Sequence, residues 1–184
     1  DAYSEDLLKR VTKDNGLMRL MTHKAKAHPK RVVFAEGVNM QVLQAAQELS
    51  AEKIAYPILV GDTADIQSKI EKNKLVIEGL KIFDPSKETS KVRKYTESYY
   101  KKMQRAGVSR SKAELKMKDL DYIALMMLEE GDADGFISGV GTPYKEVFDK
   151  AKEVIGLQPC CKYAAGMHIV STKKGTYFLS DTTV

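Results

Sequence analysis

Long apolar runs and spaced cysteines are what this sequence lacks. No apolar stretch approaches the roughly 20 residues of a membrane-spanning helix and no signal peptide is visible, so we expect no membrane partner. The two cysteines, Cys160 and Cys161, are adjacent, which suits neither a disulfide framework nor a zinc site and favours a reducing cytoplasm. The GxGxxG fingerprint of dinucleotide binding is also missing, so we expect no nucleotide cofactor on this chain.

The composition is that of a globular domain. Of the 184 residues, 43% are hydrophobic and 30% are charged, which allows a sizeable core. The chain begins at Asp1 without a methionine and stops at Val184 inside a strand-like run, so we expect it to be a piece of a longer protein.

Short apolar runs alternate with amphipathic stretches through most of the chain. After a first helix at 17–26, this pattern predicts strands at 31–35, 56–60, 80–83 and 136–137, and helices at 39–52, 63–73, 88–106, 109–117, 120–130 and from 143 to 155. Such an order predicts an α/β fold with a mostly parallel sheet, right-handed crossovers and flanking helices.

The pattern changes near residue 158. Two strands are predicted in succession, at 164–171 and 176–181, with Lys173, Lys174 and Gly175 between them, which is typical of a hairpin. We therefore expect a linker helix over 1–16, a first α/β subdomain over 17–157 and the start of a second subdomain over 158–184.

The loop at 138–142 is the main candidate site. Ser138, Gly139 and Gly141 supply a hydroxyl and bare backbone N–H groups after a short strand, and Thr142 is predicted to cap a helix whose first residue is Pro143. Such a helix start attracts anions or acyl groups, although an ordinary structural turn has the same spacing. Glu36 follows the first strand in the same way.

Other candidates have simpler explanations. Asp132 and Asp134 are candidate metal ligands because two carboxylates lie close together in the sequence. A carboxylate pair before a strand is more often part of a solvated turn, so we expect no metal. His23, His28 and His168 are scattered and are interpreted as structural.

The segment 87–118 combines lysines and arginines with tyrosines, a mixture found in nucleic-acid-binding proteins. On a helix, however, Val92, Tyr95, Tyr99 and Met103 fall on one face and the lysines face water. We therefore predict an amphipathic helix and no nucleic-acid partner.

Five segments together carry a family resemblance: RVVFAEG (31–37), YPILVGD (56–62), GDADGFISG (131–139), VIGLQPCCKYAAG (154–166) and TYFLSDTTV (176–184). In this order and spacing they resemble the phosphate acetyltransferase/phosphate butyryltransferase family over about 17–184. The run YYKKMQRAGVSRSKA (99–113), the lead-in helix and the ending GTYFLSDTTV resemble in particular the C-terminal transacetylase-type domain of large bacterial NADP-dependent malic enzymes. The resemblance implies two subdomains flanking a cleft, as in isocitrate and isopropylmalate dehydrogenases, and a ligand-site role for Asp181.

Three positions depart from the pattern of active transacetylases, which move an acetyl group between coenzyme A and phosphate. Asp149 and Met103 stand where those enzymes have arginines, and Tyr144 stands where they have a small hydroxyl residue. We therefore expect no catalytic residue here.

The resemblance to malic enzymes instead implies a homo-oligomerising domain that senses acetyl-CoA or a related acyl-CoA. NADP and a divalent metal, Mg or Mn, would then belong to a region absent from this chain. A fragment of a catalytic phosphate acetyl- or butyryltransferase, and a stand-alone binding module, remain the alternatives.

Overall fold

The computed structural model describes residues 16–172 and 175–180. It divides into two compact units, one of Pro29–Gly156 and one that combines Asp1–His28 with Leu157–Val184. The first unit contains the parallel sheet and the candidate site. Within the described residues, no helix has both the length and the apolar character needed to cross a membrane.

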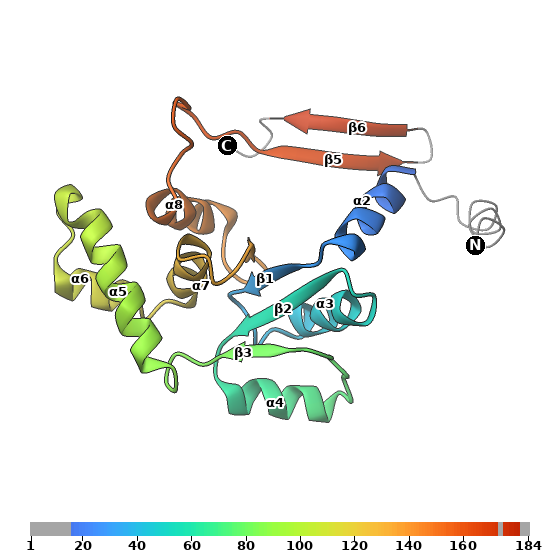
Figure 1. Cartoon of the computed structure of the whole chain (residues 1–184), viewed down its shortest axis with the longest axis horizontal. Helices are drawn as coiled ribbons and strands as arrows, with labels where there is room; N and C mark the ends of the chain where they lie inside the picture. Colours follow the sequence, from blue (N-terminus) through green and yellow to red (C-terminus); the bar gives the residue numbers. More distant parts are fainter. Residues whose placement is uncertain (1–15, 173–174, 181–184) are drawn as a thin grey trace. The chain divides into compact units, whose positions relative to one another are not determined.

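A four-stranded sheet forms the centre of the larger unit (Figure 1). It consists of β1 (Lys30–Phe34), β2 (Ala55–Val60), β3 (Lys81–Phe83) and β4 (Gly135–Ile137). The strand order is β3-β2-β1-β4, and every pairing is parallel. The predicted α/β class with a mostly parallel sheet is thereby confirmed.

Two helices cover one face of this sheet. α3 (Met40–Ala51) and α4 (Thr63–Lys72) begin at Asn39 and Asp62, whose side chains accept backbone N–H groups of the first turn. Phe34 and Leu59 point from the strands into the cluster that these helices bury. Because side chains alternate along a strand, their neighbours point to the other face.

On the opposite face, α7 (Leu120–Glu129) packs directly on β1, β2 and β4. α5 (Thr89–Met103) and α8 (Tyr144–Val154) pack against α7, and α6 (Arg110–Lys116) packs against α5. A short 3-10 turn, η1 (Gln104–Ala106), follows α5. Tyr95 and Tyr99 of α5 are fully buried there, which confirms the predicted amphipathic helix. Seven consecutive residues of α7, 121–127, are buried, as its nearly all-apolar sequence predicts.

The smaller unit contains α2 (Gly16–Ala27) and an antiparallel hairpin of β5 (Met167–Thr172) and β6 (Gly175–Ser180). The predicted hairpin is confirmed. α2 groups with this hairpin, whereas the sequence suggested that it belongs to the first subdomain. The linker helix predicted over 1–16 and the candidate ligand residue Asp181 lie outside the described residues, apart from Gly16 at the start of α2.

Candidate functional site

The site lies where the connections of the sheet change direction. The chain runs from β1 to β2 to β3 on one side of β1 and then returns to place β4 on its other side. In open parallel sheets, ligands bind beyond the carboxyl ends of the strands at such a switch point. Glu36 follows β1 there and the loop 138–142 follows β4, so the fold brings together two candidates that are about 100 residues apart. We call Glu36 and residues 138–142 the switch-point site.

The Glu36 carboxylate is held by the loop. Its Oε2 accepts the Val140 N–H at 2.8 Å, and its Oε1 accepts the N–H groups of Gly141 at 2.8 Å and Thr142 at 3.1 Å. The Thr142 hydroxyl lies 3.3 Å from the same Oε1. Consecutive N–H groups that converge in this way form an anion-binding nest, and its occupant here is the protein's own carboxylate.

This contact also explains a wrong prediction about α8. The sequence predicted Thr142 as the helix cap and Pro143 as the first helical residue, but Pro143 is the capping residue, without a side-chain cap, and the helix begins at Tyr144. Thr142 directs both its N–H and its hydroxyl to Glu36. Thr142 is therefore bonded to the loop that follows β1 and does not cap the helix.

Two glycines allow the contact between the loop and the end of β1. A Cβ on Gly37 would lie 2.7 Å from the Val60 carbonyl oxygen and 2.9 Å from the Leu59 Cβ, so only glycine fits beside the end of β2. A Cβ on Gly141 would lie 3.3 Å from Glu36 Oε1. Small residues on both sides thus let the carboxylate reach the loop.

Ser138 is oriented by Asp121, a residue that the sequence did not indicate as part of the site. Its hydroxyl donates to Asp121 Oδ1 at 2.6 Å, and Lys150 of α8 donates to Asp121 Oδ2 at 2.7 Å. Asp121 is almost completely buried at the start of α7. The only sequence signal was a carboxylate in the first turn of an otherwise apolar helix, which is also the ordinary composition of a helix start.

The polarity of Ser138 follows from this arrangement. Burial alone would lower the pKa of Lys150, but its bonds to Asp119 and Asp121 raise it, so the ammonium stays charged and neutralises the buried carboxylate. Because the Ser138 hydroxyl donates its proton to Asp121, only its oxygen lone pairs remain for a ligand, so Ser138 would accept a hydrogen bond from that ligand. The sequence alone favoured the opposite role for Ser138, that of a hydrogen-bond donor to an anion.

An apolar pocket of about 390 Å³ adjoins the loop. It is lined by side chains of β4 and α8 and by the start of the loop: Phe136, Ile137, Ser138, Gly139, Tyr144, Val147, Phe148 and Ala151. The rings of Tyr144 and Phe148 stack with their centroids 5.8 Å apart. A pocket of this size and lining suits the apolar part of a small ligand.

The three positions predicted to depart from the transacetylase pattern occupy different environments. Tyr144 lines the apolar pocket. Asp149 is exposed on α8, and Met103 at the end of α5 packs against the core cluster. No positive charge is therefore contributed by any of these three positions.

The candidate metal ligands have internal partners instead. Asp134 accepts two bonds from the Arg31 guanidinium, at 2.8 and 3.0 Å, and Asp132 accepts the Tyr95 hydroxyl. Over 16–172 and 175–180, no group of three or more His, Cys, Asp or Glu side chains is placed to hold a metal ion.

Comparison with known proteins adds the family context. The family model described as "Phosphate acetyl/butaryl transferase" matches residues 16–184. The NADP-dependent malic enzyme of Salmonella typhimurium is 33% identical over 187 residues, which cover 100% of this chain and 25% of that protein. The phosphate acetyltransferase of Thermoanaerobacterium thermosaccharolyticum is 28% identical, with 91% of this chain and 52% of that protein covered.

Among solved structures, the EutD phosphotransacetylase from Staphylococcus aureus superposes with a TM-score of 0.79 at 22% identity, over 91% of this chain and 50% of that one. The chain thus spans about a quarter of the Salmonella typhimurium malic enzyme and about half of each of these two transacetylases. At this identity the superposition shows a shared fold.

Proposed function

Because this chain belongs to the phosphate acetyl/butaryl transferase family, we propose that it is the transacetylase-like domain of an NADP-dependent malic enzyme, an enzyme that decarboxylates malate oxidatively to pyruvate. In this proposal the domain binds acetyl-CoA or a related acyl-CoA at the switch-point site and regulates the attached enzyme. It forms homo-oligomers in the cytoplasm and has no transacetylase activity of its own. NADP and a divalent metal, Mg or Mn, are bound by the part of the protein outside this chain.

The observation that carries the proposal is the charge of the site. Transfer of an acetyl group between coenzyme A and phosphate requires fixed positive groups, because both substrates are anionic. Here Asp149 and Met103 supply none, and the amides at 140–142 are already bonded to the Glu36 carboxylate. This arrangement favours a binding role over a catalytic one.

The malic enzyme relatives support the assignment of the parent. The proteins of Salmonella typhimurium and Escherichia coli both align over 100% of this chain, at 33% and 32% identity. Regulation then requires only that the effector bind two conformations of the protein with different affinities. The apolar pocket beside Ser138 offers a place for the acyl part of such an effector.

The second candidate is a catalytic phosphate acetyl- or butyryltransferase. It is favoured by the transacetylase fold and by matches such as the phosphate acetyltransferase of Nitratidesulfovibrio vulgaris, 29% identical over 164 residues. In this case the missing charges would have to come from other positions.

Two assays on the full-length protein separate these candidates. We expect malate-dependent NADPH production that changes when acetyl-CoA is added, and acetyl-phosphate formation about two to four orders of magnitude below that of an active transacetylase, because each missing arginine contact is worth about 1.5–3 kcal/mol. Rapid acetyl-phosphate formation without any effect of acetyl-CoA on malate turnover would refute the proposal.

A pair of glycine variants tests whether the effect comes from the switch-point site. Gly141→Ala crowds Glu36 Oε1, whereas a Cβ at Gly135 would meet only Val32 Cγ2, at an ordinary 3.7 Å. We expect Gly141→Ala to reduce the response to acetyl-CoA and Gly135→Ala to retain it. Equal responses in the two variants would place the effector elsewhere.

A further inference from the structure

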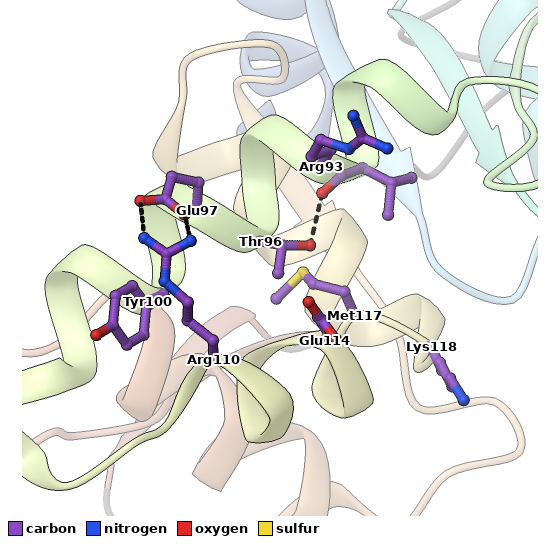
Figure 2. Close-up of a pocket in the computed structure, with 9 residues that line it drawn as sticks. Arg93, Thr96, Glu97, Tyr100, Arg110, Glu114, Met117 and Lys118 are labelled. Atoms are coloured by element: carbon purple, nitrogen blue, oxygen red, sulfur yellow. Dashed lines mark hydrogen bonds and ion pairs between the residues drawn. The ribbon is translucent and has the colours of Figure 1, made fainter.

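The groove between α5 and α6 has its arginine and its aromatic ring already engaged with the chain's own side chains (Figure 2). The terminal nitrogens of Arg110 each lie 3.1 Å from a carboxylate oxygen of Glu97, and its guanidinium carbon lies 4.9 Å from the centroid of the Tyr100 ring. Reactive side chains without such partners in the described part of the chain lie instead in the smaller unit, at Cys160 and Cys161.

Cys160 and Cys161 are two free thiols on adjacent residues, and both are exposed. They lie a few residues after Gly156, the last residue of the larger unit. Within 16–172 and 175–180, no hydrogen bond or ion pair joins either thiol to another residue. One small ligand can therefore reach both sulfur atoms.

A tight turn fixes the backbone of this pair. The Cys161 N–H donates to the Gln158 carbonyl oxygen at 3.0 Å, which closes a four-residue turn with Pro159 and Cys160 at its centre. The φ angle of Cys160 is +76°. Proline at the second position followed by a positive φ at the third is the geometry of a type II turn.

The turn itself does not call for a cysteine. The third position of a type II turn favours glycine, because a side chain is strained at positive φ. Cys160 thus carries its thiol at a position where the backbone disfavours any side chain. Backbone outliers of this kind are found where the side chain has a role of its own.

The spacing of the two cysteines limits what they can bind. The peptide bond between them is trans, so their Cα atoms are about 3.8 Å apart, whereas a disulfide usually joins Cα atoms about 4.4–6.8 Å apart. A single atom inserted between the sulfurs lengthens the bridge. Zinc needs four ligands, and in the described part of the chain no group of three or more His, Cys, Asp or Glu side chains could supply them.

We propose that Cys160 and Cys161 form a dithiol site for a trivalent arsenical with one organic substituent. Such an arsenic atom has two exchangeable hydroxyl groups, which match the two thiols, and sulfur is a soft ligand. Each hydroxyl leaves as water with the proton of one thiol while an arsenic–sulfur bond forms, so no atom changes its oxidation state. Neither cysteine belongs to the switch-point site, so the inference does not depend on the proposed function.

The test treats the folded full-length protein with phenylarsine oxide and then titrates the product with the monothiol 2-mercaptoethanol. Mass spectrometry of the tryptic peptide 153–162, which contains both cysteines of this chain, locates the adduct. Cys160→Gly and Cys161→Ser each remove one thiol, and glycine suits the positive φ at position 160. Gln158→Ala is the matched control, because it changes an exposed side chain of the same turn and keeps both thiols. Circular dichroism checks the fold of each variant.

We expect one phenylarsenic group per peptide in the native protein and in Gln158→Ala. Its release should need a monothiol concentration at least about a hundredfold higher than in either single-cysteine variant, because the second arsenic–sulfur bond forms within the same molecule. The inference is overturned if the peptide gains no adduct until the protein is unfolded in urea, if it gains two phenylarsenic groups, or if a single-cysteine variant retains the adduct as firmly as the native protein.

Discussion

Replacing Glu36 by glutamine tests the contact on which the switch-point site depends. The change keeps the shape of the side chain and one carbonyl oxygen, but it removes the charge and turns an N–H₂ group toward the loop. In the native protein the carboxylate accepts three backbone N–H groups, from Val140, Gly141 and Thr142, and the Thr142 hydroxyl lies near it. The variant therefore leaves at least one of these donors without its acceptor.

The expected size of the effect follows from the strength of such bonds. A hydrogen bond to a charged group contributes about 1.5–3 kcal/mol, and the exposure of Val140 and Gly141 to water reduces this value. We expect local opening of the loop to become easier by at least about 1.4 kcal/mol, which corresponds to a tenfold loss of amide protection.

Hydrogen exchange at the three loop amides measures this directly. We expect faster exchange at 140–142 in Glu36→Gln and no change at β2 in the centre of the sheet. Glu48→Gln is the matched control, because it makes the same chemical change at an exposed position of α3. If the loop amides exchange at the native rate in Glu36→Gln, the carboxylate does not hold the loop and our account of the site is wrong.

Three further predictions concern stability and assembly. Gly37→Ala should lower the free energy of unfolding by about 1–3 kcal/mol in urea titrations, because its Cβ would lie 2.7 Å from the Val60 carbonyl oxygen. Gly135→Ala should lower the free energy of unfolding by less, because its Cβ would meet only Val32 Cγ2 at 3.7 Å. The Ser86 hydroxyl and the Thr63 N–H hold the pKa of the Asp84 carboxyl well below its usual value, so its stabilisation is present above the unfolded pKa of about 3.9 and is lost as the pH falls further. Asp84→Asn should consequently destabilise the protein more at neutral pH than in acid, and an equal loss at both would contradict this. The hairpin exposes apolar side chains such as Phe178, which is 62% exposed, so Phe178→Ser should reduce self-association in light scattering, and an unchanged mass would exclude the hairpin as the contact.

Sequence periodicity was enough to predict most of the elements. β2, α3 and α7 were predicted to within one or two residues at each end, because their apolar spacing and capping residues are local signals. The alternation of β and α segments also predicted the parallel sheet. The burial of Tyr95 and Tyr99 followed from their spacing on α5.

The start of α8 shows where local signals fail. Thr142 followed by a proline is a good local cap, but Thr142 is instead bonded to the carboxylate of Glu36, in the loop after β1. Asp121 was missed for the same reason, since its bonds to Ser138 and Lys150 span 17 and 29 residues.

The sequence by itself determined the α/β class, the hairpin and the family, because each depends on spacing along the chain and on short motifs. Only the tertiary structure decided what the loop after β4 binds. The strand order β3-β2-β1-β4 places Glu36 beside amides that are 104 to 106 residues away. Strand order results from packing the whole core, so no local pattern contains it.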